Sequence, residues 1–318
     1  MRTAFINELC EVAAENERVW LLCADIGYSV LERFADRFPD RFVNVGVAEQ
    51  NMTGIAAGLA MSGKIVFTYS IANFPTLRCL EQIRSDVCYH NANVKVVSVG
   101  GGLAYGPQGY THHGLEDLAI MRSLPNMKVV APADPVEAQL ATRAVATLAG
   151  PAYLRLGKAN EPVVHSDLPS FETGKVVKVQ DGERVLIVST GGMLKTVLDV
   201  GKQLENQGVK AAIWSSPWLK PFDEAAIRTA LSRFSLIVTV ENAQESGGLG
   251  SCVAEVIAES ESGGTRLIRA GVPDTILKRA YSQEAGRSML GLDAASLSQR
   301  VLALLESAPD GVMSNVGQ

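Results

Sequence analysis

Residues 42–52 of the chain read Phe42-Val43-Asn44-Val45-Gly46-Val47-Ala48-Glu49-Gln50-Asn51-Met52. The apolar start predicts a strand, Gly46 predicts a turn, and residues 53–61 predict a helix. That helix is crowded with glycine and alanine, which indicates that another element packs closely against it. A strand, a turn and a helix in this order form the unit from which parallel α/β sheets are built.

Glu49 stands at the start of this helix, among small and apolar residues. A carboxylic acid in such a place can hydrogen-bond an edge nitrogen of a buried heteroaromatic ring and control its protonation. Acidic residues also favour the first turn of any helix, where they meet the positive end of the helix dipole. The segment alone leaves both interpretations open.

The alternation of strand and helix patterns continues along the whole chain. Four of the six residues of the run Val94–Val99 are valine, as is typical of a strand buried on both faces. Further strands are predicted at 19–24, 42–45, 64–68, 128–131 and 152–156, with helices at 4–15, 30–38, 74–91, 115–122 and 135–148. A second block predicts strands at 184–189, 210–215, 236–241 and 266–270, and helices at 193–207, 223–233, 250–259 and 294–307. The pattern predicts two parallel-sheet α/β domains.

A polar, proline-bearing stretch separates the two blocks. We expect a first domain over residues 1–165, a linker over 166–176, a second domain over 177–308 and a frayed tail over 309–318.

Composition narrows the class of protein. The net charge of −5, without a basic run, argues against nucleic acid as a partner. No apolar stretch approaches 18 residues, so we expect no membrane span, and the N-terminus lacks the apolar core of a signal peptide. The five cysteines are scattered, without a C-x-x-C pair, which favours reduced core thiols and a cytoplasmic protein. The spacing of histidines and cysteines predicts no metal site.

Three segments together resemble the transketolase family, including its relative 1-deoxyxylulose-5-phosphate synthase. They are V-A-E-Q-N-M at 47–52, G-P-Q-G-Y-T-H-H-G-L-E-D-L at 106–118 with R-S-L-P-N at 122–126, and G-G-L-G-S at 247–251 after V-E-N at 240–242. Each motif alone is weak evidence, but their order and separation cover nearly the whole chain. The chain is therefore similar to the pyrimidine-binding domain of that family followed by its C-terminal domain.

The resemblance implies an enzyme that uses thiamine diphosphate and Mg²⁺ and transfers a two-carbon ketol unit from a ketose phosphate to an aldose acceptor in carbohydrate metabolism. In the family another domain holds the diphosphate and the metal through a Gly-Asp-Gly motif, and this sequence contains no such motif. We therefore expect one subunit of a two-chain transketolase. Its partner would be an N-terminal subunit that carries the diphosphate-binding domain, in an α₂β₂ heterotetramer.

The resemblance also implies roles for individual residues around the cofactor. Glu49 matches the glutamate that hydrogen-bonds the aminopyrimidine ring nitrogen. Phe74 matches an aromatic residue that stacks on the ring, and Tyr69 stands close to a second position of this kind. Ordinary core packing is the alternative interpretation for both aromatic residues.

A second group of residues matches positions that face the sugar. His112 matches a histidine that faces the substrate and can donate to a developing alkoxide, whereas we expect the adjacent His113 to pack. The positions expected to bind the substrate are His112, Arg2, Ser29, Gln108 and Arg155, with Arg155 on a phosphate. For the 247–251 loop we favour a structural role over anion binding.

Two departures from the family concern the substrate channel. Gln108 replaces an aspartate and Gly100 stands where transketolases often have a histidine. Both changes point to a modified sugar or an unusual acceptor aldehyde. Two other functions stay open: a β subunit of a 2-oxo acid dehydrogenase or a synthase component, and a non-catalytic scaffolding chain.

Overall fold

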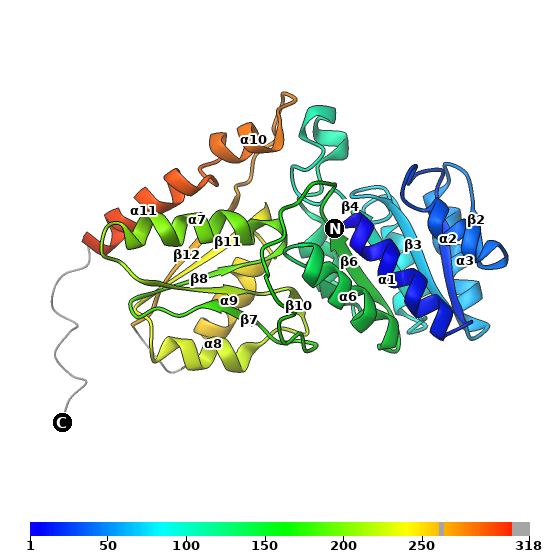
Figure 1. Cartoon of the computed structure of the whole chain (residues 1–318), viewed down its shortest axis with the longest axis horizontal. Helices are drawn as coiled ribbons and strands as arrows, with labels where there is room; N and C mark the ends of the chain where they lie inside the picture. The colour runs from blue at the N-terminus through cyan, green and yellow to red at the C-terminus, as the bar shows by residue number, and fades with distance from the viewer. Residues whose placement is uncertain (261–263, 307–318) are drawn as a thin grey trace.

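The computed structural model describes residues 1–260 and 264–306. The first part of the chain is built around a seven-stranded sheet (Figure 1). The strand order is β10-β5-β6-β4-β3-β1-β2, and every pairing is parallel except that of β10 with β5. The strands are β1 Val19–Cys23, β2 Phe42–Asn44, β3 Ile65–Ile71, β4 Val94–Val99, β5 Lys128–Val130, β6 Ala152–Leu156 and β10 Trp218–Lys220. Parallel strands bring their carboxyl ends to one edge of the sheet, where ligands bind in folds of this kind.

Helices cover both faces of this sheet. On one face α1 (Arg2–Glu15), α2 (Glu32–Arg37) and α6 (Pro135–Thr147) pack over Phe67 and Val97. On the other face α3 (Glu49–Met61) and α5 (Asp117–Ser123) pack over Val66 and Val96. Because successive strand residues point to opposite faces, adjacent residues of one strand belong to different cores.

The segment 72–91 departs from the single helix that the sequence predicts. Successive turns occupy 72–79, followed by α4 (Leu80–Gln82) and a π-helical turn (Ile83–Cys88). Pro75 disfavours the helical conformation at Phe74, so the chain turns above the carboxyl end of β3 before the helix begins. These turns place Phe74 and Arg78 beside the start of α3.

A five-stranded sheet organises the rest of the chain, in the order β12-β11-β8-β9-β7. Its strands are β7 Val177–Gln180, β8 Val185–Ser189, β9 Ala211–Ser215, β11 Leu236–Gln244 and β12 Arg266–Val272, and only β7 is antiparallel to its neighbour. Helices α7 (Leu194–Glu205) and α11 (Ala294–Glu306) cover one face, and α8 (Glu224–Leu231) and α9 (Leu249–Ala258) cover the other. A short helix, α10 (Gln283–Met289), reaches back toward the first sheet (Figure 1).

The prediction of two α/β domains built on parallel sheets is confirmed, with additions that the sequence pattern did not reveal. Each sheet gains one antiparallel edge strand, β10 or β7, and α10 was also not predicted. Strand β10 follows the expected linker in sequence but joins the first sheet, where Trp218 enters the core. The predicted tail at 309–318 lies outside the described residues. Within the described ranges, no helix has the length and apolar character that a membrane crossing requires.

Candidate active site at the carboxyl edge of the first sheet

Glu49 is a buried carboxylate at the first position of α3, with a side chain only 3% exposed. Nη1 of Arg78 donates to its Oε2 at 2.8 Å, and the hydroxyl of Ser70 donates to its Oε1 at 3.4 Å. A buried charge needs such partners, because burial removes its hydration. The Arg78 side chain is half exposed, so this carboxylate lies just beneath the protein surface rather than deep in the core.

Four more side chains continue from this ion pair in a line of contacts. The Arg78 guanidinium lies over the Phe74 ring, 4.6 Å from its centroid. The Phe74 ring meets the His112 ring edge-on at 5.2 Å, and His112 lies 6.3 Å from the Tyr105 ring. Nζ of Lys158 lies over the Tyr105 ring at 4.7 Å. We call this set the contact row: Glu49, Arg78, Phe74, His112, Tyr105 and Lys158.

The contact row unites segments that are far apart in sequence. It joins the start of α3, the turns at 72–79, the glycine-rich loop at 100–114 and the end of β6. It brings together three of the residues predicted from sequence: Glu49, Phe74 and His112. Sequence reasoning missed its other three members, because none of them lies in a motif and only the packing shows their contacts.

Gly100 and Tyr105 form a matched pair inside the glycine-rich loop. Gly100 has φ +82°, and a Cβ at this position would lie 2.1 Å from atoms of the Tyr105 ring. The ring of Tyr105 therefore occupies the space that a side chain at position 100 would need.

Substituting Gly100→Ala should lower the free energy of unfolding by about 2 kcal/mol, because positive φ and the clash with Tyr105 both disfavour a Cβ there. Adding Tyr105→Ala removes the clash, so the double variant should be more stable than the sum of the two single effects predicts. Urea unfolding of the wild type, both single variants and the double variant measures this coupling. Additive effects would contradict the pairing.

The two adjacent histidines have different environments. His113 is 2% exposed, and its Nε2 lies 3.3 Å from the carbonyl oxygen of Gly106, which is its acceptor. His112 is partly exposed, and its Nδ1 lies 3.0 Å from the hydroxyl of Thr111. His112 is therefore the more accessible of the two imidazoles, while His113 is bonded within the loop.

Arg155 lies in a buried ion pair rather than at an open surface. Its Nε donates to Asp117 Oδ2 at 2.7 Å, and its Nη2 donates to the carbonyl oxygens of Gly114 and Asn242. These bonds tie β6 to α5, to the glycine-rich loop and to the second domain. Lys158, three residues later and partly exposed, belongs to the contact row instead.

The remaining predicted residues are not members of the contact row. Tyr69 is 2% exposed and stacks on Phe5 at 5.9 Å, on the face of β3 opposite to Ser70. Burial raises the pKa of Tyr69, and the charge of Arg2 opposes this shift. The structure leaves Ser29 and Gln108 exposed, with the backbone N–H of Ser29 donating to Glu32.

The glycine-rich loop at 247–250 is bound from inside the protein. The carboxylate of Glu241, 1% exposed, accepts the backbone N–H groups of Leu249 and Gly250 at 2.8 Å each, and so caps α9. A Cβ at Gly248 would lie 1.9 Å from Oε2 of Glu241, so only glycine admits the carboxylate. These contacts support the structural role expected for this loop.

Burial raises the pKa of Glu241 to about 7, although the two N–H groups oppose the shift. The folded state then binds more protons than the unfolded state between about pH 4.5 and 7, so this group lowers the stability as the pH rises through that window. Glu241→Gln removes the titrating group. Relative to the variant, wild type should lose up to about 3 kcal/mol between pH 4.5 and 7.5 in urea unfolding. A constant difference across this range would contradict the shift.

The comparisons with known proteins agree with the motifs. Residues 1–163 match the family model described as the transketolase pyrimidine binding domain, and residues 174–297 match that of the transketolase C-terminal domain. One of the named subunits of an apulose-4-phosphate transketolase, from Actinobacillus succinogenes, is 35% identical over 85% of this chain and 87% of its own length.

Two further matches concern a longer enzyme and a solved structure. The 1-deoxy-D-xylulose-5-phosphate synthase 1 of Geobacter sulfurreducens is 32% identical over 98% of this chain and 49% of its own length. A split-gene transketolase, solved as an inactive β4 tetramer, superposes with a TM-score of 0.86 at 36% identity, over 96% of this chain and 97% of that one. The chain belongs to the transketolase family and contains its pyrimidine-binding and C-terminal domains.

Proposed function

We propose that this chain is the pyrimidine-domain subunit of a two-chain transketolase that depends on thiamine diphosphate. The observation that carries the proposal is the buried carboxylate of Glu49, held by Arg78 at the head of the contact row. Membership of the family supports it, as does the similarity to a protein named as a transketolase subunit. The reaction is the transfer of a two-carbon ketol unit from a ketose phosphate to an aldose.

The residues around Glu49 fit the aminopyrimidine end of the cofactor. A buried carboxylate is available to a ring nitrogen, and the aromatic ring of Phe74 stands close by. Bound thiamine diphosphate supplies the electron sink for cleavage of the ketose. In this proposal Glu49 exchanges a proton with the ring nitrogen, Arg78 keeps its carboxylate oriented, and Phe74 excludes water from the ring.

The other end of the contact row suits the sugar. His112 is partly exposed between Phe74 and Tyr105, where its imidazole can donate to a substrate oxygen. Lys158 adds a cation at the far end. Arg2, Ser29, Gln108 and Arg155 stay proposed substrate contacts on the basis of the resemblance. A bulky Tyr105 over Gly100 supports a sugar that differs from an ordinary pentose phosphate.

A partner subunit would complete the site by holding the diphosphate and Mg²⁺. The exposed face of α3 supports an interface beside Glu49, because Gly54 and Gly58 leave open space there and Ile55 and Met61 are exposed. We infer an α₂β₂ assembly. The division of the chain at 166–176 and a cytoplasmic location also stay proposals, the latter supported by five buried cysteines without disulfides.

The decisive experiment combines this chain with a subunit that carries the Gly-Asp-Gly motif, thiamine diphosphate and Mg²⁺. Ketol transfer between sugar substrates supports the proposal. Decarboxylation of a 2-oxo acid, with no ketol transfer, would replace it with the dehydrogenase function if the product is oxidised, or with the synthase function if the product is joined to an aldehyde.

A further inference from the structure

The segment 157–176 connects the two domains, from the end of β6 to the start of β7. All of its residues are described, and none lies in a helix or strand. It carries Lys158, whose Nζ lies over the Tyr105 ring of the contact row. A segment without secondary structure keeps one position only where its backbone and side chains bind the elements beside it. The contacts of this segment with the two domains therefore decide where Lys158 lies.

A buried aspartate of the first domain binds the backbone of this segment. Asp134 is 0% exposed and caps the N-terminus of α6, where its Oδ1 accepts the backbone N–H of Glu137 at 2.8 Å. Its Oδ2 accepts the backbone N–H groups of Val164 and His165, at 2.8 Å and 3.1 Å. One carboxylate therefore joins the start of α6 to the connecting segment.

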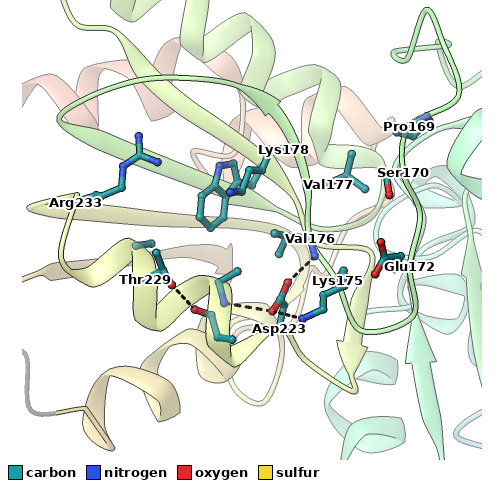
Figure 2. A pocket seen from close by; sticks show the side chains of 14 residues that line it. Pro169, Ser170, Glu172, Lys175, Val176, Val177, Lys178, Asp223, Thr229 and Arg233 are labelled. Atoms are coloured by element: carbon teal, nitrogen blue, oxygen red, sulfur yellow. Dashed lines mark hydrogen bonds and ion pairs between the residues drawn. The ribbon is translucent and has the colours of Figure 1, made fainter.

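The second domain repeats this arrangement at the other end of the segment. Asp223, 7% exposed, caps α8 by accepting the backbone N–H of Ala226 at 3.2 Å. It also accepts the backbone N–H of Val176 at 3.2 Å (Figure 2). The segment is thus tied at two points, each at the start of a helix in one of the two domains.

The cation at these two points differs. At α8, Nζ of Lys175 pairs with Oδ1 of Asp223 at 3.3 Å. At α6, Nε2 of His165 lies 3.0 Å from Oε1 of Glu137, whose other oxygen accepts the backbone N–H of Ala133 at 2.8 Å. The side chain of Glu137 is 0% exposed and that of His165 is 8% exposed. Because lysine titrates far above histidine, the contact at α6 is the one that can change its charge near neutral pH.

The carboxylates at the start of α6 favour the charged form of His165. The hydrogen bond to Glu137 raises the pKa of His165 above its ordinary value of 6.5, burial opposes the shift, and the charges of Glu137 and Asp134 add to it. Among the described residues these two carboxylates are the ionisable groups that face the imidazole, since the nearby Asp167 accepts from Ser166 instead. The ion pair stabilises the contact below pH 6.5, and this contribution is lost as the pH rises through the raised pKa.

We propose that Asp134, Glu137 and His165 form a pH-sensitive clasp that fixes residues 158–164, and that His165 is thereby a positioning residue for Lys158. A buried Glu137 that loses its counter-charge holds the segment less tightly. The bonds from Asp134 to the backbone remain, so the segment loosens without detaching. The proposal rests on the proposed function only for the sugar that Lys158 meets.

Hydrogen exchange of single backbone amides in the full chain tests the clasp. Between pH 6 and 8.5 the protection factor of the Val164 amide should fall by about 5- to 10-fold more in wild type than in His165→Gln. Two proteins must be compared because the ammonium of Met1, which pairs with Glu161, is an α-amino group, and such groups also titrate in this range. The Val176 amide, at the lysine-based contact, should change equally in both. Equal falls at Val164, or the same difference at Val176, would overturn the clasp.

Two further variants separate charge from packing. His165→Lys keeps a positive charge at pH 8.5, so the protection of its Val164 amide at that pH should exceed that of wild type. His90→Gln is the matched control, because it removes an exposed histidine beside Tyr89 and should keep the wild-type fall. If His165→Lys protects Val164 no better than wild type at pH 8.5, the charge does not hold the segment and the proposal is wrong.

Kinetics of the two-chain complex test the effect on Lys158. His165→Gln should raise KM for the ketose by about 3- to 10-fold at pH 6 with kcat almost unchanged, and the two complexes should converge at pH 8.5. A KM ratio that is the same at both pH values would contradict a pH-sensitive positioning role. If the complex shows no ketol transfer at all, the proposed function fails, whereas the exchange measurement still decides whether the clasp exists.

Discussion

Replacing Glu49 by glutamine should lower kcat for ketol transfer by the two-chain complex by about 10²- to 10⁴-fold. Glutamine retains an oxygen that can accept from Arg78, so the local fold and the contact with Phe74 should survive. It cannot exchange a proton with the cofactor ring, which is the step assigned to this carboxylate. The loss should therefore fall on kcat far more than on cofactor binding.

Glu81→Gln is the matched control for this variant. Glu81 is an exposed glutamate of α4, with a side chain 69% exposed in a weak pair with Arg84. Its substitution should leave kcat unchanged, and near-UV circular dichroism should show that both variants keep the native fold. A Glu49→Gln complex with full activity would favour the non-catalytic scaffolding role instead.

The second large effect concerns the partner subunit. Purified alone with thiamine diphosphate, Mg²⁺ and sugars, this chain should show at least about 10³-fold less turnover than the complex, because Glu49 serves only the pyrimidine end of the cofactor. Adding the partner should restore activity, with saturation at one partner chain per chain. The measurement is a titration of ketol transfer against partner concentration.

A competition experiment controls for the quality of the preparation. The Glu49→Gln chain should assemble with the partner and reduce the activity of a wild-type mixture in proportion to its share. Vigorous metal-dependent turnover by the solitary chain would refute the division of the site between two subunits.

Local patterns in the sequence predicted most of the strands and helices and proposed some of the residues of the candidate site. Alternating strand and helix signals predicted both sheets, because buried parallel strands and amphipathic helices differ in their periodicity. Glu49 was proposed as a site residue from its motif and the family resemblance, because the helix start alone left a structural role open. Phe74 and His112 followed from the motifs, and the structure places their rings in contact.

For other residues the sequence did not show which face of the sheet each side chain points to, and only the structure shows this. Tyr69 and Ser70 are neighbours in β3, yet only Ser70 faces Glu49, because strand residues alternate between faces. The alternation was visible in sequence, but the face on which α3 packs was not. Similarly, Arg155 lies in β6 and Lys158 lies just after it. Arg155 is buried against Asp117, whereas Lys158 is partly exposed.

The sequence by itself determined the family and the two α/β domains, because periodicity and motif spacing are local properties of the chain. Only the tertiary structure decided that Arg78 holds Glu49, that Tyr105 fills the space over Gly100, and that Arg155 is buried in an ion pair with Asp117. These contacts join residues distant in sequence. Their energies depend on burial and on the distance between charges, and both quantities exist only once the chain has folded.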